Sequence, residues 1–405
     1  MNVGVLIIGM GSLSGAGGAE RFYADLFEAY NSQANPKRKL FYISDDLSPL
    51  RKINKLKSFP ENQLTFTSYH YRLFHRITKN RPRIDKWMNN FRAYLTMKSL
   101  IKQLKRQNVT MLQLPVYEDK DFYLLKALDN LPLIERPKLI LNMTNAVVQN
   151  HYFDDNPRYA YHSKLNYGRL FENVKLDGVY TWYAAFKKFA EKEKVIKSNP
   201  IIHNVATRFT STEFHEDFTN RENKIIYSGR LSEYKDPMLF VKAAEEVYKR
   251  IPNNGWKFEM YGKGGLENQV KAYIEQHNLS DFLSLNFSPD MPSVLKKSKI
   301  YVSTQNVENF PSLAMAEAMA CCNVIVARNV GQTNLYVKHN VNGFFMETGS
   351  SQELADKLVN LMNKPDSFIE TMGKESISLL KNVHNKENFI KEIDEFWDTI
   401  KNNKE

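Results

Sequence analysis

The 405-residue sequence has little cysteine and no long apolar segment, and both absences limit what the chain can be. Its only cysteines, Cys321 and Cys322, are adjacent, so an ordinary disulfide between them would be strained and a cysteine-built metal cage is excluded. No apolar run reaches the roughly eighteen residues of a membrane-spanning helix. The first residues also lack the basic flank and cleavage pattern of a signal peptide. We therefore expect a cytoplasmic protein in a reducing compartment.

Basic residues outnumber acidic ones by 56 to 45, and residues 71–106 hold most of the excess. From Arg72 to Arg106 the sequence has eleven basic residues and one acidic residue, interleaved with aromatic and aliphatic side chains. This composition suits peripheral contact with an anionic membrane or binding of an anionic acceptor. It equally suits a solvated basic helix whose apolar side lies in the core. Because no zinc-finger spacing or RNA-recognition motif accompanies the charge, we do not expect nucleic-acid binding.

Short apolar runs alternate with helical patterns along the chain, which indicates an α/β fold with parallel sheets. The first half is expected to contain strands at 3–8, 40–43, 111–114, 139–143 and 178–181. A second unit of the same kind begins near Lys224, with strands expected at 225–228, 257–261, 283–287, 300–303 and 324–327. The pattern restarts rather than extends, so we predict two doubly wound, Rossmann-like domains.

The domain boundary is predicted in the polar, irregular segment 198–223. This gives an N-terminal domain over residues 1–203 and a C-terminal domain over 204–384. An amphipathic helix is expected near the end of the chain, within residues 385–405. It could cross back to the first domain, anchored by Trp397, or pack on its own domain.

Two basic side chains follow the first strand of the second domain. Arg230 lies in Gly229-Arg230-Leu231, and Lys235 comes a few residues later. Open α/β sheets bind ligands at the carboxyl ends of their strands, so these cations are expected beside the ligand. A guanidinium grips phosphate oxygens bidentately and an ammonium adds a point charge, which suits a diphosphate.

An acidic segment follows at residues 308–320, with a helix expected from Pro311 to Ala320 and Glu308 on the loop before it. Pro311 suits the first turn of a helix. The backbone N–H groups around it, those of Phe310, Ser312 and Leu313, would then be free to meet an anion. Glu317 has apolar or small neighbours, and a buried carboxylate usually has a specific partner. It could accept hydrogen bonds from two vicinal hydroxyls of a ribose, while Glu308 could accept one from a sugar hydroxyl.

Taken together, these motifs resemble the retaining glycosyltransferases of the GT-B fold, in particular glycosyltransferase family 4, over nearly the whole chain. Each motif is weak, but their order and spacing are specific. The matching segments are GAGGAERF at 15–22, SGRLSEYKD at 228–236, YGKGGLENQV at 261–270, EAMA at 317–320, NVGQT at 329–333 and NGFF at 342–345.

The resemblance implies a GT-B architecture, with two Rossmann-like domains facing a cleft, and a set of donor-site residues. Gly17 and Gly18 would approach the donor phosphate or the acceptor, and Gly262 would line the donor site. Arg230 and Lys235 would neutralise the diphosphate. Glu317 would hold the ribose and Glu308 the transferred sugar, with support from the backbone of Phe310, Pro311, Ser312 and Leu313.

The sequence departs from the family pattern in two places near the reacting centre. Eight residues separate Glu308 from Glu317, where the family usually has seven, so Asn309 could fill the slot of Glu308. Many relatives carry a histidine after a strand of the first domain, where this chain has Asn145, with His151 six residues beyond. Either residue could lie at the reacting centre.

The expected function is transfer of a sugar from a nucleoside diphosphate donor to a hydroxyl acceptor, with retained anomeric configuration. The acceptor is expected to be a glycan or a lipid-linked glycan, and the protein could lie peripherally on the cytoplasmic membrane face. No essential metal or other cofactor is expected, because the acidic pair Asp119 and Asp121 lies outside the donor domain, in an expected exposed turn. The alternatives are a non-catalytic GT-B-like binding or regulatory subunit and, on the basis of Gly9 and Gly11, an NAD-type oxidoreductase.

Overall fold

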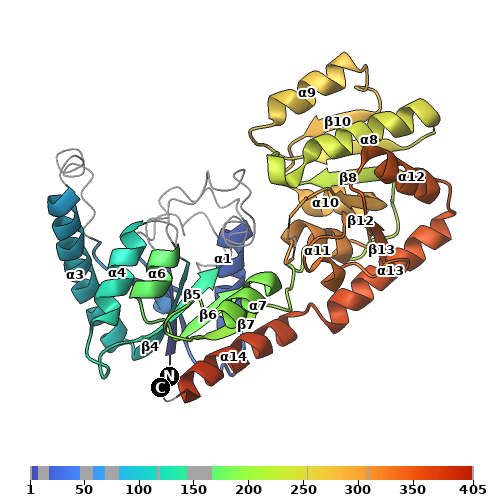
Figure 1. Ribbon diagram of the computed structural model, residues 1–405. Coiled ribbons are helices and arrows are strands. Elements are labelled where there is room, and N and C mark those ends of the chain that lie inside the picture. Colours follow the sequence, from blue (N-terminus) through green and yellow to red (C-terminus); the bar gives the residue numbers. More distant parts are fainter. Residues whose placement is uncertain are drawn as a thin grey trace. The chain divides into compact units, whose positions relative to one another are not determined.

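The computed structural model describes residues 2–7, 18–45, 58–68, 82–115, 119–143, 167–252, 254–307 and 310–403. The chain divides into two compact units, one made of Met1–Val205 with Ile390–Glu405 and the other of Ala206–Phe389. Each unit has one sheet with helices packed on it (Figure 1).

The first unit contains a seven-stranded sheet in the order β3-β2-β1-β4-β5-β6-β7, and all its strand pairs are parallel. Its strands are β1 (Asn2–Ile7), β2 (Leu40–Ser44), β3 (Gln63–Thr65), β4 (Val109–Pro115), β5 (Lys138–Met143), β6 (Gly178–Thr181) and β7 (Ile201–Asn204). The central strands are near-continuous apolar runs, as expected where helices cover both faces of a parallel sheet.

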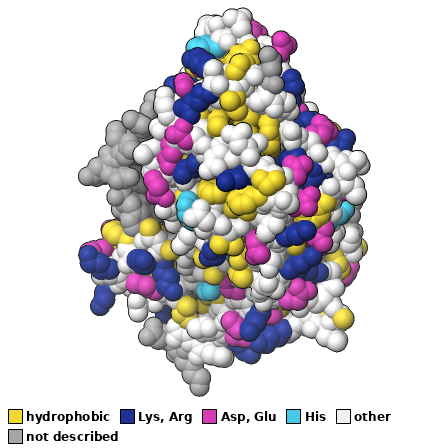
Figure 2. All heavy atoms as spheres, turned by 90° about the vertical axis from the view of Figure 1, so that its right-hand side faces the viewer, with side chains coloured by type: hydrophobic (Ala, Val, Ile, Leu, Met, Phe, Trp, Pro, Cys, Tyr) yellow, Lys and Arg dark blue, Asp and Glu magenta, His cyan; other side chains and the backbone are white. Residues whose placement is uncertain are grey.

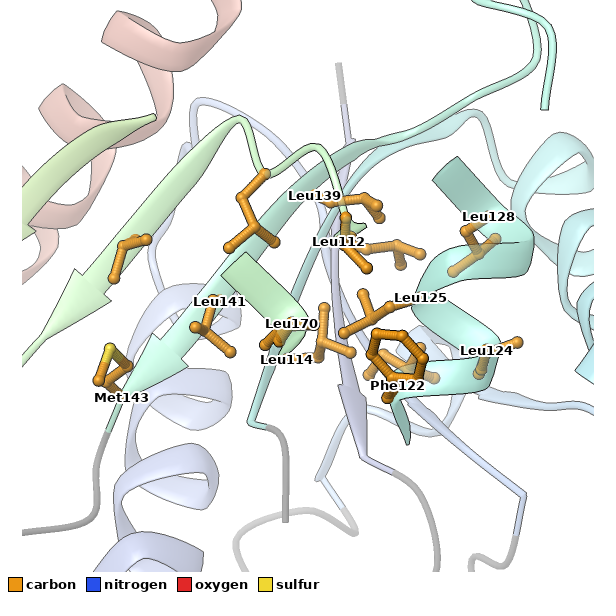
Figure 3. Packing of buried hydrophobic residues seen from close by; sticks show 14 of the residues in the cluster. Leu112, Leu114, Phe122, Leu124, Leu125, Leu128, Leu139, Leu141, Met143 and Leu170 are labelled. Atoms are coloured by element: carbon orange, nitrogen blue, oxygen red, sulfur yellow. The ribbon is translucent and has the colours of Figure 1, made fainter. Parts of the chain in front are cut away.

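The helices of this unit are η3 (Pro60–Asn62), α1 (Gly18–Asn31), α3 (Pro82–Arg106), α4 (Asp119–Asp129), α6 (Tyr167–Asn173) and α7 (Ala184–Glu193). Figure 3 shows how α4 closes one part of the core, where Phe122 and Leu125 lie close to Leu112 and Leu114 of β4. These four side chains are almost fully buried.

The C-terminal helix α14 (Lys386–Asn402) contributes most of its length to the first unit. Trp397 is fully buried, and its Nε1 donates a hydrogen bond of 2.8 Å to Oε1 of Gln113 on β4. Arg38 pairs with Asp398 of this helix at 2.6 Å. A Cβ atom on Gly178 would lie 2.4 Å from Cδ1 of Ile400, so the helix reaches β6 closely. The last residues of the chain therefore complete the core of its first half.

The second unit contains a six-stranded parallel sheet in the order β10-β9-β8-β11-β12-β13. Its strands are β8 (Lys224–Ser228), β9 (Lys257–Tyr261), β10 (Leu283–Asn286), β11 (Ile300–Ser303), β12 (Val324–Arg328) and β13 (Gly343–Met346). Its helices are η4 (Glu233–Lys235), α8 (Pro237–Arg250), α9 (Glu267–Gln276), α10 (Met291–Lys297), α11 (Leu313–Ala320), η5 (Thr333–Leu335), α12 (Ser351–Met362) and α13 (Asp366–Asn382).

The predicted fold class, two doubly wound parallel α/β sheets, is confirmed. Two local predictions were wrong. The segment 198–223, expected to be irregular, contains β7 at the edge of the sheet, where Asn204 lies opposite Thr181 of β6. Asp119 to Asp121, expected in an exposed turn, form the first turn of α4. Among the described helices, none has the length and apolarity needed to cross a membrane.

Candidate functional site

Three loops of the second unit meet where its strand order reverses, at the carboxyl ends of β8 and β11. The loop after β8 is bound to the loop after β9 by a hydrogen bond of 3.0 Å from the Leu231 N–H to the Lys263 carbonyl. The loop after β11 joins them, because the hydroxyl of Thr304 donates to the Lys235 carbonyl at 2.8 Å. Ligands of doubly wound sheets bind at such a reversal point.

Two glycines allow the first two loops to approach this closely. A Cβ atom on Gly262 would lie 1.9 Å from the carbonyl oxygen of Gly229, and one on Gly264 would lie 2.3 Å from that of Leu231. Both contacts are with backbone atoms, which cannot rotate away. The structure therefore gives Gly262, predicted from the sequence as a donor-site residue, a packing role that fixes the loop carrying Arg230.

Arg230 is exposed and Lys235 is half-buried, and the two cations are close enough to affect each other. Burial, together with the positive charge of Arg230, lowers the pKa of Lys235 to about 8. Among the described residues, neither of these two cations forms an ion pair. Uncompensated positive charge at the end of a strand favours an anionic ligand.

Asp236 holds the backbone that carries Lys235. The Asp236 backbone is in the left-handed region at φ 45°. Its side chain caps α8 by accepting a hydrogen bond of 3.3 Å from the Leu239 N–H. The same carboxylate pairs with Arg328, at the end of β12, at 2.5 Å. Our sequence analysis did not identify this clamp, although Asp followed by Pro is a common helix start.

The helix α11 begins at Leu313, two residues later than predicted. Ser312 is its N-cap and accepts a hydrogen bond of 3.3 Å from the Met315 N–H, so Pro311 precedes the helix instead of forming its first turn. Helix geometry then leaves the N–H groups of Leu313 and Ala314 for a ligand or solvent. The Phe310 ring is buried and packs against Tyr336 at 4.9 Å between centroids, so its side chain belongs to the core.

Glu317 lies in the middle of α11 with only 5% of its surface exposed. Burial and the nearby charge of Glu317 raise the pKa of Tyr301, whose hydroxyl donates to the Ser228 carbonyl at 3.0 Å. The carboxylate therefore lies near Tyr301 of β11, whose hydroxyl reaches the end of β8. Among the predicted residues, Arg230, Lys235, Gly262 and Glu317 come together in one unit.

The remaining predicted residues cannot be placed in this site. Gly17, Asn145, His151 and Glu308, as well as Gly9, Gly11 and Asn309, lie outside the described residues. Gly18 is the first residue of α1. In the described part of the chain, no group of three histidine, cysteine, aspartate or glutamate side chains could hold a metal ion.

Part of the second unit is similar in sequence to known proteins. Residues 209–377, inside the second unit, match the family model described as "Glycosyl transferases group 1". An uncharacterized glycosyltransferase of Haemophilus influenzae is 31% identical over 158 residues, which is 38% of this chain and 43% of that protein. The Escherichia coli UDP-Gal:alpha-D-GlcNAc-diphosphoundecaprenol alpha-1,3-galactosyltransferase is 28% identical over 184 residues, or 44% and 46% of the two chains. The chain thus spans less than half the length of these curated relatives.

Solved structures match nearly the whole chain. HepE of Anabaena, in complex with UDP and glucose, has a TM-score of 0.68 at 14% identity and covers 98% of this chain and 100% of its own. Sucrose-phosphate synthase of Thermosynechococcus elongatus has a TM-score of 0.69 at 12% identity, covering 98% of both chains. The fold is therefore that of the GT-B glycosyltransferases, as the resemblance predicted.

The close approach of the two loops yields a test with a matched control. Gly264→Ala should lower the melting temperature by several degrees, because the new methyl group collides with the Leu231 backbone. Gly265→Ala should leave it unchanged, since a Cβ atom there meets nothing within 4 Å. Thermal unfolding of both variants would check this. Equal behaviour of the two variants would contradict the proposed packing role.

Proposed function

We propose that the protein is a retaining glycosyltransferase of family 4, which moves a sugar from a nucleoside diphosphate donor to a hydroxyl acceptor. The observation that carries the proposal is the pair of cations, Arg230 and Lys235, that have no ion-pair partner among the described residues and follow β8 where the strand order reverses. The same unit also carries the buried carboxylate of Glu317. The match of residues 209–377 to the glycosyltransferase family model supports it.

In this proposal the second unit binds the donor. Arg230, Lys235 and the free N–H groups at the start of α11 hold the diphosphate, and Glu317 accepts hydrogen bonds from the ribose. These groups stabilise the negative charge that grows on the phosphate as its bond to the anomeric carbon breaks. The acceptor oxygen bonds to that carbon from the same face and passes its proton to the departing phosphate. No metal is needed in this scheme, because the two cations neutralise the diphosphate.

The first unit would bind the acceptor, and Gly17 and Gly18 would approach either the donor phosphate or the acceptor. Either Asn145 or His151 would lie at the reacting centre. Glu308 or Asn309 would contact the transferred sugar. We propose a UDP-sugar as donor and a glycan or lipid-linked glycan as acceptor. The name of the E. coli enzyme above, which includes UDP-Gal and a diphosphoundecaprenol-linked sugar, supports this choice. A second relative is named as a poly(ribitol-phosphate) alpha-N-acetylglucosaminyltransferase of Staphylococcus aureus, whose acceptor is a polymer. Such an enzyme would work at the cytoplasmic face of a membrane, in contact with it through residues 71–106.

A thermal-shift panel of UDP, GDP, ADP and CDP, each with Mg²⁺ or with EDTA, tests the donor assignment. A ligand that binds only the folded state stabilises it, by about 2.7 kcal/mol at a hundredfold excess over Kd. We expect UDP to raise the melting temperature equally in both conditions, and Arg230→Ala and Glu317→Ala to remove the effect. Arg250→Ala, an exposed arginine on α8 paired with Asp356, is the control and should retain it.

Adding NAD to the panel, together with an assay of sugar transfer, separates the alternatives. Stabilisation by UDP without sugar transfer to any glycan acceptor would favour a non-catalytic binding or regulatory subunit. A shift with NAD alone would favour an oxidoreductase and would overturn the proposal.

The lowered pKa of Lys235 predicts a pH dependence of nucleotide binding. With a pKa of about 8 instead of 10.5, this lysine is mostly charged at pH 7 and mostly neutral at pH 9. The affinity for UDP should therefore fall by about tenfold between pH 7 and pH 9, as the fraction of charged lysine falls. Lys235→Arg, which stays charged, should bind UDP with little change over this range. Calorimetric titration at several pH values measures both, and a flat wild-type profile would show that Lys235 does not meet the diphosphate.

A further inference from the structure

A continuous stripe of side chains runs along the solvent face of α3. Its seven members are spaced three or four residues apart, so they share one side of the helix. They are Ile84, Trp87, Phe91, Tyr94, Lys98, Lys102 and Lys105. We refer to these residues as the α3 stripe. Its first half is apolar and aromatic and its second half is basic.

The apolar half of the α3 stripe is exposed to an unusual degree. Trp87 is 63% exposed, Phe91 47%, and Ile84 and Tyr94 44% each. The rings of Trp87 and Phe91 stack with their centroids 5.7 Å apart and their planes 1° from parallel. The ammonium of Lys98 lies 4.6 Å from the centroid of the Tyr94 ring, at the junction with the basic half.

The core-facing side of the same helix is already occupied. Ala93, Met97, Leu100, Ile101 and Leu104 are buried, and α3 packs on α4 at the edge of the first unit (Figure 1). The two interpretations of the basic segment, an apolar side in the core and a membrane contact, therefore apply to opposite sides of α3. The apolar side in the core does not account for the aromatic residues of the α3 stripe, which lie on the other side.

The charge around the α3 stripe is almost entirely positive. Arg83 and Lys86 are exposed beside its apolar half, and Asp85 is the one acidic residue of the helix. Glu135 pairs with Lys105 at 3.1 Å, at the far end. By contrast, Lys, Arg, Asp and Glu side chains are intermixed on the face of the molecule drawn in Figure 2. Exposed aromatic residues in line with lysines match an anionic lipid surface, where rings enter the headgroup layer and ammonium groups meet lipid phosphates.

We infer that α3 lies flat on an anionic membrane along the α3 stripe, which spans 22 residues, or about 32 Å at the rise of an α-helix. This narrows the membrane contact proposed for residues 71–106 to one face of one helix. It does not depend on the sugar-transfer chemistry. Leu133 and Ile134, 82% and 96% exposed, come directly before Glu135 and add apolar surface near the basic end.

Flotation of the whole protein with phosphatidylcholine vesicles, with and without about one third phosphatidylglycerol, tests the inference. We expect binding only to the anionic vesicles and its loss at high salt. Trp87 provides an internal probe, because the other tryptophans are less exposed, Trp256 at 6% and Trp397 at 0%, with Trp182 partly buried. Its emission should shift to the blue on binding, and Trp87→Phe should remove that shift while retaining most of the binding.

Charge reversal supplies the matched comparison. The double variant Lys98→Glu with Lys102→Glu should bind anionic vesicles at least about tenfold more weakly. Each lysine near such a surface raises the affinity about fivefold. Lys188→Glu with Lys192→Glu, two exposed lysines one turn apart on α7, should bind as the wild type does. Stabilisation by UDP should be the same in both double variants, so loss of lipid binding is separable from loss of the donor site.

Two results would overturn the inference. One is no flotation with anionic vesicles, or flotation that the α3 variants leave unchanged. The other is a lipid-independent dimer that Trp87→Ala with Phe91→Ala dissociates, which would assign the α3 stripe to a second copy of the chain.

Discussion

The contact on which the candidate site depends is the close approach of two backbone loops at the carboxyl edge of the second sheet. The loop after β9 can lie against the loop after β8 only because Gly262 and Gly264 have no side chain. Three main-chain hydrogen bonds follow from this approach, from Gly229 to Tyr261, from Leu231 to Lys263 and from Leu266 to Leu231. Arg230 is therefore carried by a fixed backbone, which lowers the entropic cost of ordering this loop when a ligand binds.

The electrostatics of the site favour an anionic ligand. Two cations stand close together without an ion-pair partner among the described residues, and burial of Lys235, together with the charge of Arg230, lowers the pKa of Lys235. The protein supplies rigid support through Asp236, which caps α8 and pairs with Arg328, but it directs this carboxylate to the framework and not to the cations. A diphosphate would relieve the repulsion between Arg230 and Lys235 while meeting both of them.

Much of this arrangement could be predicted from the sequence, because strands buried on both faces are apolar runs and because ligand sites follow strand ends. The predicted positions of the strands, and of Arg230 and Lys235 after β8, rest on these two rules. Short edge strands such as β7 were missed, since four residues with half-buried side chains carry no periodic signal. The start of α11 was misjudged because a serine cap outweighs a proline one residue earlier. The pairing of Asp236 with Arg328 joins residues 92 positions apart, which no local pattern shows.

Hydrogen–deuterium exchange with and without UDP tests the central claim most directly, because it locates the nucleotide on the chain. The account predicts slower exchange in peptides that cover residues 229–236 and 312–317, with little change in β1 to β6 of the first unit. Protection confined to the first unit, with none in those two segments, would show that the cations and Glu317 do not form the donor site.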